Sequence, residues 1–129
     1  MIKETYLFSD ITELIIGSAM KVHNTLGNGF PEVIDHRALK IELQKTPLHV
    51  QSEIERSVQY EGQTIGKRRV DLLINEQVLV ELKALATFDP SESNQVLNYL
   101  TAFELPVGLL INFGKKRLEF KRYIHNNLN

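Results

Sequence analysis

Cysteine is absent from this sequence, and its absence excludes several kinds of site at once. A disulfide framework, cysteine-ligated zinc and thiol catalysis all need that side chain. No apolar run approaches the roughly 18 residues of a membrane-spanning helix. Residues 1–10 also lack the basic start and long apolar region of a signal peptide. We therefore expect a soluble, cytoplasmic protein with no membrane partner.

An excess of charge of either sign is also lacking. The 129 residues include 15 Lys and Arg against 16 Asp and Glu, for a formal net charge of −1. Without a bulk positive field, contact with nucleic acid would need a local basic patch. The sequence holds neither a glycine-rich phosphate-binding loop nor a Ser–His–Asp signature, which disfavours P-loop and serine hydrolases. No repeat or linker divides the chain, so we predict one domain over residues 1–129.

Apolar residues at helical spacing predict helices over residues 10–26 and 32–45. Asp10 is the predicted N-cap of the first helix, and Glu13 completes a capping-box pattern. Gly27 is the predicted stop of this helix. The second helix has one proline suited to its first turn and another after its end. Its predicted apolar positions are Val33, Ile34, Ala38, Leu39 and Ile41.

From residue 50 the apolar period changes to two, which predicts an antiparallel meander of strands. Strands are predicted over residues 50–60, 64–74, 78–84, 107–112 and 117–124. The fourth of these is a continuous apolar run, so we expect it to be buried on both faces. Asp89-Pro90-Ser91 signals a third helix that ends before Pro106. The order ααβββαββ predicts an α+β fold of the α/β type, in which helices flank one mixed β-sheet.

Two acids and a lysine, Asp71, Glu81 and Lys83, interrupt the second and third strands. Glu81 and Lys83 are two residues apart, so they face the same side of the sheet. A two-residue turn between these strands would place Asp71 on the opposite face, whereas a three-residue loop at 75–77 sets Asp71 opposite Glu81. The three-residue loop is favoured because it gathers the apolar side chains on one face. These side chains are Val70, Leu72, Ile74, Val78, Val80 and Leu82.

The favoured register brings two carboxylates into direct opposition, with Cβ atoms about 5 Å apart. Like charges so placed repel each other unless a cation lies between them. Two carboxylates with room for water suit Mg²⁺ or Mn²⁺, and Lys83 could hold a phosphate or position water beside the metal. The structural alternative is that Glu81 pairs with Lys83 or Arg69 and that Asp71 caps a helix. Both interpretations stay open.

These residues resemble the core of a known family. Asp71, followed by Glu81-Leu82-Lys83, resembles the D…(D/E)xK motif of the PD-(D/E)xK nuclease superfamily. The sequence is also similar to the GxxExxY proteins, a prokaryotic branch of that superfamily, over nearly the whole chain. The similar segments are IIGSAMKVHNTLGNGFPE (15–32), RRVDLLINEQVLVELKA (68–84), NQVLNYL (94–100) and VGLLINFG (107–114). The resemblance implies a restriction-endonuclease-like core.

The resemblance also implies roles for particular residues. Asp71 and Glu81 would be the principal metal ligands, and Glu32, at the start of the second helix, would complete the metal site. Lys83 would be the catalytic lysine. Gln95, on the third helix, corresponds to a polar residue that faces the site. The catalytic set is therefore expected to contain Lys83, Glu81, Asp71 and Gln95, with Mg²⁺ or Mn²⁺ as the cofactor.

The sequence departs from the family pattern at one position. The namesake motif has Gly, Glu and Tyr at a spacing of three; Gly29 and Glu32 are present, but Asp35 occupies the Tyr position. This departure implies a different substrate or impaired activity. Asp35 could add an acid near the site, one turn from Glu32. It could instead be a solvent-exposed acid favoured by the helix dipole, and this second interpretation is preferred.

Other polar and aromatic residues have both functional and structural interpretations. His23 and His36 could touch a phosphate or a metal, although packed or surface histidines are the expected alternative. His49 and His125 have no partner pattern. Basic clusters on adjacent strand ends could form a nucleic-acid patch, or could protect edge strands. There are two clusters, residues 67–69 and residues 115–117 followed by 121–122. Tyr99, Phe103 and Phe113 could stack on bases, with core packing preferred for Phe103.

Two functions from different classes follow. The first is a metal-dependent nuclease-like protein that hydrolyses phosphodiester bonds in nucleic acid. The alternative is a catalytically inactive nuclease-fold module that binds nucleic acid or a protein partner. A homodimer that uses the apolar surface of the first helix is a further possibility.

Overall fold

The computed structural model describes residues 7–125, within which helices and strands follow one another in the predicted order ααβββαββ. They are α1 Ser9–Leu26, α2 Glu32–Leu43, β1 Val50–Tyr60, β2 Gln63–Ile74, β3 Val78–Lys83, α3 Pro90–Phe103, β4 Val107–Asn112 and β5 Glu119–Ile124. Most of the segment judged to lack a signal peptide lies outside the described residues. The single-domain organisation of residues 1–129 stays a prediction.

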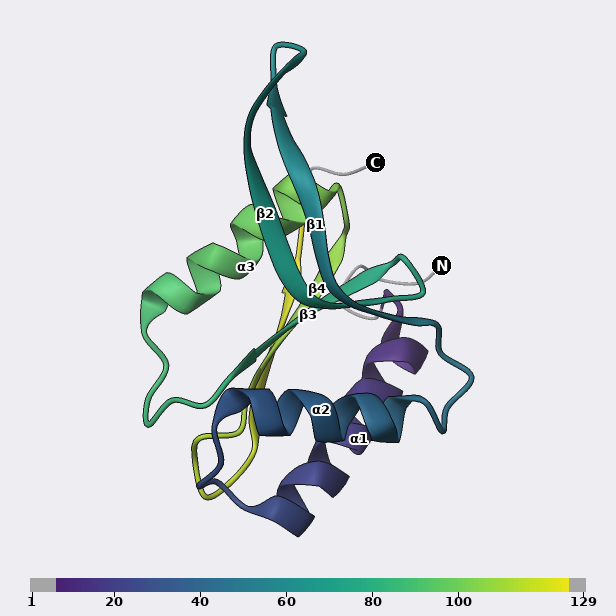
Figure 1. Cartoon of the computed structure of the whole chain (residues 1–129), viewed down its shortest axis with the longest axis vertical. Helices are drawn as coiled ribbons and strands as arrows, with labels where there is room; N and C mark the ends of the chain where they lie inside the picture. Colours follow the sequence, from purple (N-terminus) through teal and green to yellow (C-terminus); the bar gives the residue numbers. More distant parts are fainter. Residues whose placement is uncertain (1–6, 126–129) are drawn as a thin grey trace.

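The five strands form one mixed sheet in the order β1-β2-β3-β4-β5. β3 and β4 are parallel and are joined by the crossover helix α3, whereas the other neighbouring pairs are antiparallel (Figure 1). One core lies between the sheet and helices α1 and α2, and a second core lies between the sheet and α3. The predicted α+β class is confirmed. None of the described helices has the length and apolar character needed to cross a membrane.

The predicted start of α1 is wrong, although its end is confirmed. Phe8, in a left-handed conformation with φ 56, occupies the N-cap position, and its carbonyl accepts the N–H groups of Ile11 and Thr12. Asp10 therefore lies inside the first turn and does not cap the helix. Gly27 ends α1 with φ 77, where its N–H donates to the carbonyl of His23 at 2.8 Å. Glycine suits this left-handed position because it has no Cβ.

Helix α2 buries a narrower face than its sequence suggests. Pro31 is the N-cap residue, so it lies just before the first turn and not within it, and the helix ends at Leu43. Two of the predicted apolar positions are wrong, because the side chains of Val33 and Ile41 are 49% and 58% exposed. The buried positions recur every four residues, at Asp35, Leu39 and Leu43. This stripe is the fully buried part of α2, and Ala38 packs beside it against the same core.

Strands β2 and β3 pair in the predicted register, with Ile74 opposite Val78 and Leu72 opposite Val80. One face of the sheet carries five of the six side chains predicted to share it, and this face forms the core under α1 and α2. They are Leu72, Ile74, Val78, Val80 and Leu82. Val70 was expected among them but belongs to the α3 core. In the pairing of β1 with β2, Asp71 and the residue opposite it, Glu53, do not pair, and Glu53 has a positive φ of 53. The pairing of β2 with β3 ends at Leu72, one residue after Asp71. The strand changes its course at Asp71, so alternation does not continue through it.

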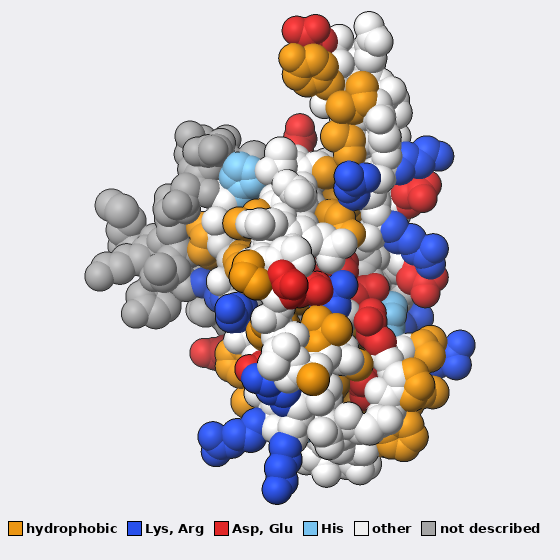
Figure 2. Space-filling model, turned by 90° about the vertical axis from the view of Figure 1, so that its left-hand side faces the viewer, with side chains coloured by type: hydrophobic (Ala, Val, Ile, Leu, Met, Phe, Trp, Pro, Cys, Tyr) orange, Lys and Arg blue, Asp and Glu red, His pale blue; other side chains and the backbone are white. Residues whose placement is uncertain are grey.

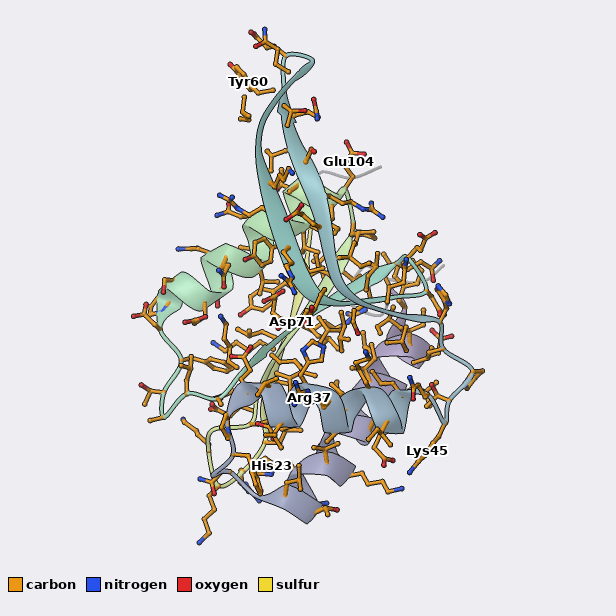
Figure 3. The ribbon with its side chains drawn as sticks, in the orientation of Figure 1. His23, Arg37, Lys45, Tyr60, Asp71 and Glu104 are labelled. Atoms are coloured by element: carbon orange, nitrogen blue, oxygen red, sulfur yellow. The ribbon has the colours of Figure 1, made fainter. Side chains whose placement is uncertain are left out.

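The β1–β2 hairpin projects beyond the rest of the sheet (Figure 1). Its register shifts by one residue between Val58 and Gln59, which marks a bulge. Tyr60, near the tip, is largely exposed (Figure 3). On α1, Leu14 and Met20 are also exposed, so the use of this helix in a homodimer stays a prediction.

Candidate active site

The site is built around the point where β2 and β3 separate. Beyond the last backbone pair, the N–H of Asp71 donates to Oε1 of Glu81 at 3.0 Å, and the N–H of Leu82 donates to Oδ2 of Asp71 at 2.8 Å. Each carboxylate thus takes a hydrogen bond that the other strand's backbone would otherwise accept. Figure 3 places Asp71 between α3 and α2 in the view shown. The predicted opposition of the two acids is therefore realised through their side chains.

One oxygen of each carboxylate is left over. Within residues 7–125, Oδ1 of Asp71 and Oε2 of Glu81 accept no hydrogen bond. The Glu81 side chain is only 5% exposed, and this burial, together with the charge of Asp71, raises the pKa of Glu81 to about 8. The two acids therefore resist carrying full negative charge together. This donor set fits a hard divalent cation, which favours carboxylate oxygens and would offset both charges.

Glu32 and Lys83 lie within electrostatic reach of this acid pair. Burial and the charge of Asp71 raise the pKa of Glu32, while Lys83 lowers it. Glu32 is the first residue of α2, so the start of that helix is what brings a third carboxylate toward the sheet. In the part of the chain that the structure describes, however, no three Asp, Glu, His or Cys side chains are arranged to hold a metal ion together.

Lys83 is half-buried and pairs with an acid that was not predicted. Its Nζ lies 3.3 Å from Oε2 of Glu92, in the first turn of α3. Burial works to lower the pKa of Lys83, but Glu92, and then Glu32 and Glu81, raise it overall. Lys83 is therefore cationic at neutral pH. The structural alternative for the acids is wrong, because Lys83 pairs with Glu92, Arg69 pairs with Glu53 and Asp71 caps no helix.

The chain that follows Lys83 is fixed by a buried asparagine. Asn112 lies beside Lys83 in the parallel β3–β4 ladder. Its Oδ1 accepts the N–H groups of Leu85 and Gly114, at 2.8 and 3.0 Å, and its Nδ2 donates to the carbonyl of Leu85 at 2.9 Å. Gly114 packs so closely that an added Cβ would lie 2.3 Å from the backbone nitrogen of Leu85. In the sequence, Asn112 is the polar residue that ends the apolar run VGLLIN, and this position could have indicated its structural role.

Gln95 and Tyr99 both belong to α3, and Tyr99 lies within electrostatic reach of the acid pair. Both line a hollow of about 400 Å³ together with Arg68 and Asn98. Burial, and then the charge of Glu81, raise the pKa of the Tyr99 hydroxyl. Gln95 makes no hydrogen bond to the acids within residues 7–125, so its predicted catalytic role stays a prediction.

The preferred interpretation of Asp35 as a solvent-exposed acid is wrong. Its side chain is 2% exposed, because it lies on the buried stripe of α2. Within the described residues its Oδ1 has no hydrogen-bond partner, and burial raises the pKa of Asp35 to about 6, although His23 opposes this rise. His23 is a packed histidine, as the alternative expected, with Nε2 2.8 Å from the carbonyl oxygen of Lys115.

The basic clusters do not lie on adjacent strands, because β2 and β5 are separated by β3 and β4. That part of the prediction is wrong. Several of these cations have acidic partners, as with Lys67 and Glu55 at 3.6 Å. Figure 2 shows Lys and Arg side chains interspersed with acids on the face in view. Phe113 and Phe103 are buried, so base stacking by Phe113 is wrong and core packing of Phe103 is confirmed.

The fold is restriction-endonuclease-like. It has a mixed sheet with this strand order, two opposed acids where the β2–β3 hairpin opens, and a lysine two residues after the second acid. The family model described as the PD-(D/E)XK nuclease superfamily matches residues 9–123, and the chain belongs to that superfamily. The narrower GxxExxY assignment stays a prediction.

The fold is shared with a solved structure. The protein in the "Crystal structure of SSO0001" is 19% identical in sequence and superimposes with a TM-score of 0.60. The alignment covers 95% of this chain and 61% of that one, so this chain spans about three fifths of that protein's length. No curated protein matches the sequence.

Proposed function

We propose that this chain hydrolyses phosphodiester bonds in nucleic acid with the help of Mg²⁺ or Mn²⁺. The observation that carries the proposal is the acid pair: Asp71 and Glu81 oppose each other, largely buried, and each keeps one carboxylate oxygen unused within residues 7–125. Membership of the PD-(D/E)XK nuclease superfamily supports it.

The unused oxygens of Asp71 and Glu81 would hold the ion, and Glu32 would complete its protein ligands. A bound divalent ion supplies activation of water and charge compensation at the phosphate. The backbone N–H groups of Asp71 and Leu82 fix both carboxylates in advance, so little reorganisation is needed. Lys83, held by Glu92, would donate hydrogen bonds to a phosphate oxygen.

The test is cleavage of labelled single- and double-stranded DNA and RNA with Mg²⁺ or Mn²⁺. Asp71→Asn and Lys83→Ala should each lower the rate by about 10²- to 10³-fold, because each removes a charge placed for the transition state. Chelation of the metal should abolish cleavage. Asp10→Asn and Lys45→Ala make the same changes on exposed parts of α1 and of the turn after α2, and should leave the rate unchanged. Cleavage that survives both site variants would refute the proposal.

A second candidate is a nuclease-fold module that binds nucleic acid without cleaving it. It is favoured by the pairing of Lys83 with Glu92, and by the absence of a ready three-ligand group among residues 7–125. Calorimetry with Mg²⁺ and Mn²⁺ separates the two candidates. The nuclease proposal requires metal binding that Asp71→Asn weakens, whereas no binding at millimolar metal would favour the second candidate.

A further inference from the structure

Two arginines oppose each other directly across the β1–β2 hairpin. Arg56 pairs with Arg68 in the ladder, on the side of the hairpin that also carries Ile54 and Val70 and faces α3. Like charges placed opposite each other destabilise a strand pair. Within residues 7–125 neither arginine forms an ion pair with a carboxylate. The guanidinium of Arg56 lies 5.2 Å from the centroid of the Phe103 ring, which holds it in place.

The other side of the same hairpin is arranged differently. There Arg69 pairs with Glu53, and Lys67 lies 3.6 Å from Glu55. Both cations on that side are therefore neutralised by acids of β1. The contrast leaves the side that faces α3 as the positive one, with two charges and no acidic partner.

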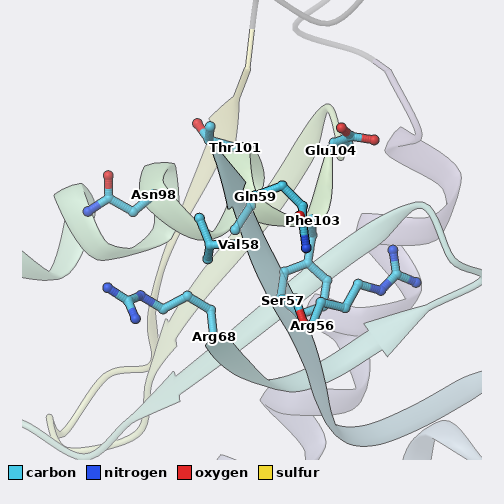
Figure 4. A pocket seen from close by; sticks show the side chains of 10 residues that line it. Arg56, Ser57, Val58, Gln59, Arg68, Asn98, Thr101, Phe103 and Glu104 are labelled. Atoms are coloured by element: carbon cyan, nitrogen blue, oxygen red, sulfur yellow. The ribbon is translucent and has the colours of Figure 1, made fainter. Parts of the chain in front are cut away.

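The two arginines line a groove between the hairpin and α3. Together with Asn98, they border a hollow of about 570 Å³ (Figure 4), and Arg68 and Asn98 also border the hollow of about 400 Å³ that contains Gln95 and Tyr99. The wall formed by α3 is polar but uncharged at successive turns, with Asn94, Asn98 and Thr101. The groove therefore leads from the neighbourhood of the acid pair toward the end of α3.

Glu104 is the one acid among the side chains that line either hollow, and it lies at the C-terminal end of α3, far along the groove from Gln95. Among the described residues, Arg68 donates only to the backbone carbonyl of Lys67, at 2.8 Å, and guanidinium groups without an acidic partner suit phosphate oxygens. Asparagine side chains can both donate to and accept from base edges and sugars. An elongated groove with these two kinds of group fits a polyanion that carries hydrogen-bonding bases, and a small anion would use only the arginines.

We infer that this groove holds a strand of nucleic acid, with Arg56 and Arg68 binding its phosphates and Asn98 contacting its bases or sugars. The identity of the ligand rests on the proposed function. The strand enters along α3 and reaches the acid pair past Gln95 and Tyr99. The opposed arginines are thus tolerated because the bound phosphates compensate their charge.

The test is fluorescence anisotropy with a labelled single-stranded oligonucleotide of about 15 nucleotides, in the presence of a chelator so that nothing is cleaved. The double variant Arg56→Ala, Arg68→Ala should bind about tenfold more weakly or worse. The slope of log K against log salt should fall by about 1 to 2, because two phosphate contacts are lost. Replacement of both arginines by lysine should restore most of the slope.

The matched control is Lys67→Ala, Arg69→Ala, which removes two cations from the other side of the same hairpin. Its affinity should change much less than that of the arginine double variant. Equal losses in the two variants would indicate unspecific attraction and overturn the groove. Urea unfolding of every variant checks the fold. If the double variant unfolds, the single variant Arg68→Ala replaces it in the binding experiment. This variant keeps the contact between Arg56 and the Phe103 ring.

Failure of the groove is distinguishable from failure of the proposed function. If the wild-type protein cleaves nucleic acid and the arginine variant binds and cleaves equally well, the groove is wrong and the nuclease stands. If binding depends on the arginines but Mg²⁺ and Mn²⁺ support no cleavage, the groove stands and the nuclease is wrong. A duplex of the same sequence forms the second arm, and arginine-dependent binding of either form supports the groove.

Discussion

Strand β2 carries two opposed like-charge pairs that differ in sign and in surroundings. Arg68 faces Arg56 on β1, and Asp71, three residues later, faces Glu81 on β3. The arginines are exposed on a continuous ladder, whereas Glu81 is buried where the ladder opens. A buried acid pair suits a small hard cation, and an exposed arginine pair suits an extended polyanion. We propose a different ligand for each pair, and the following predictions test whether either pair costs stability in the free protein.

The largest effect is expected for Glu81→Gln, which removes one charge of the acid pair but keeps an acceptor for the N–H of Asp71. The pKa of Glu81 is raised from the ordinary value for a glutamate, 4.5, to about 8. The metal-free wild type should therefore lose stability as the pH rises from that ordinary pKa to about 8, where the buried carboxyl group ionises. The unfolding free energy of the variant minus that of the wild type should therefore increase by about 1 to 3 kcal/mol as the pH rises from roughly 5 to 9.

Urea unfolding with a chelator measures this gain. Added Mg²⁺ should stabilise the wild type and leave Glu81→Gln nearly unchanged, since the ion binds the folded wild type only. A stability difference that does not vary with pH would show that neither burial nor the charge of Asp71 raises the pKa of Glu81.

A smaller effect is expected for Asp35→Asn, which tests a buried acid that has no opposed acid across a strand. The pKa of Asp35 is raised to about 6, so its ionisation costs stability as pH rises from the ordinary value through 6, and the cost is complete above that. The unfolding free energy of the variant minus that of the wild type should increase by about 1 to 2 kcal/mol as the pH rises from roughly 4 to 8. The gain should be insensitive to Mg²⁺, in contrast to that of Glu81→Gln; equal sensitivity would place Asp35 among the metal ligands.

The smallest effect is expected at the arginine pair. Arg68→Glu places a carboxylate opposite Arg56 and should raise the unfolding free energy by about 0.5 kcal/mol. Arg69→Glu, one residue away, breaks the pair with Glu53 and should lower it by a similar amount. Urea midpoints at low salt compare the two, and salt should shrink both changes. Changes of the same sign would contradict the view that only one side of the hairpin carries unrelieved charge.

Much of the fold could be predicted because local patterns encode it. The alternation of apolar residues around the 75–77 loop fixed the β2–β3 register, since a slip of one residue would expose the apolar set. Val70 was misplaced because the strand changes its course at Asp71, which depends on both neighbouring strands. The capping prediction for Asp10 failed because a left-handed Phe8, which no sequence signal marked, begins the helix one residue earlier.

The candidate site also has features that could be predicted from the sequence and features that could not. The opposition of Asp71 and Glu81 follows from a short loop, so it could be predicted, whereas the pairing of Lys83 with Glu92 depends on how α3 crosses the sheet. The arginine pair could not be predicted, because the turn alone would set Arg56 opposite Lys67. The bulge between Val58 and Gln59 shifts the register by one residue and brings Arg68 into place.

The parallel pairing of β3 with β4 has a consequence for the order in which the chain can assemble. The two acids meet on a hairpin closed by a short loop, a contact of low sequence separation that forms quickly. The carbonyl of Lys83, by contrast, accepts the N–H of Phe113, which arrives only after α3 has crossed over and β4 has docked. The acids can thus come together early in folding, whereas the backbone that carries the lysine is fixed only once the slower, non-local half of the sheet has formed.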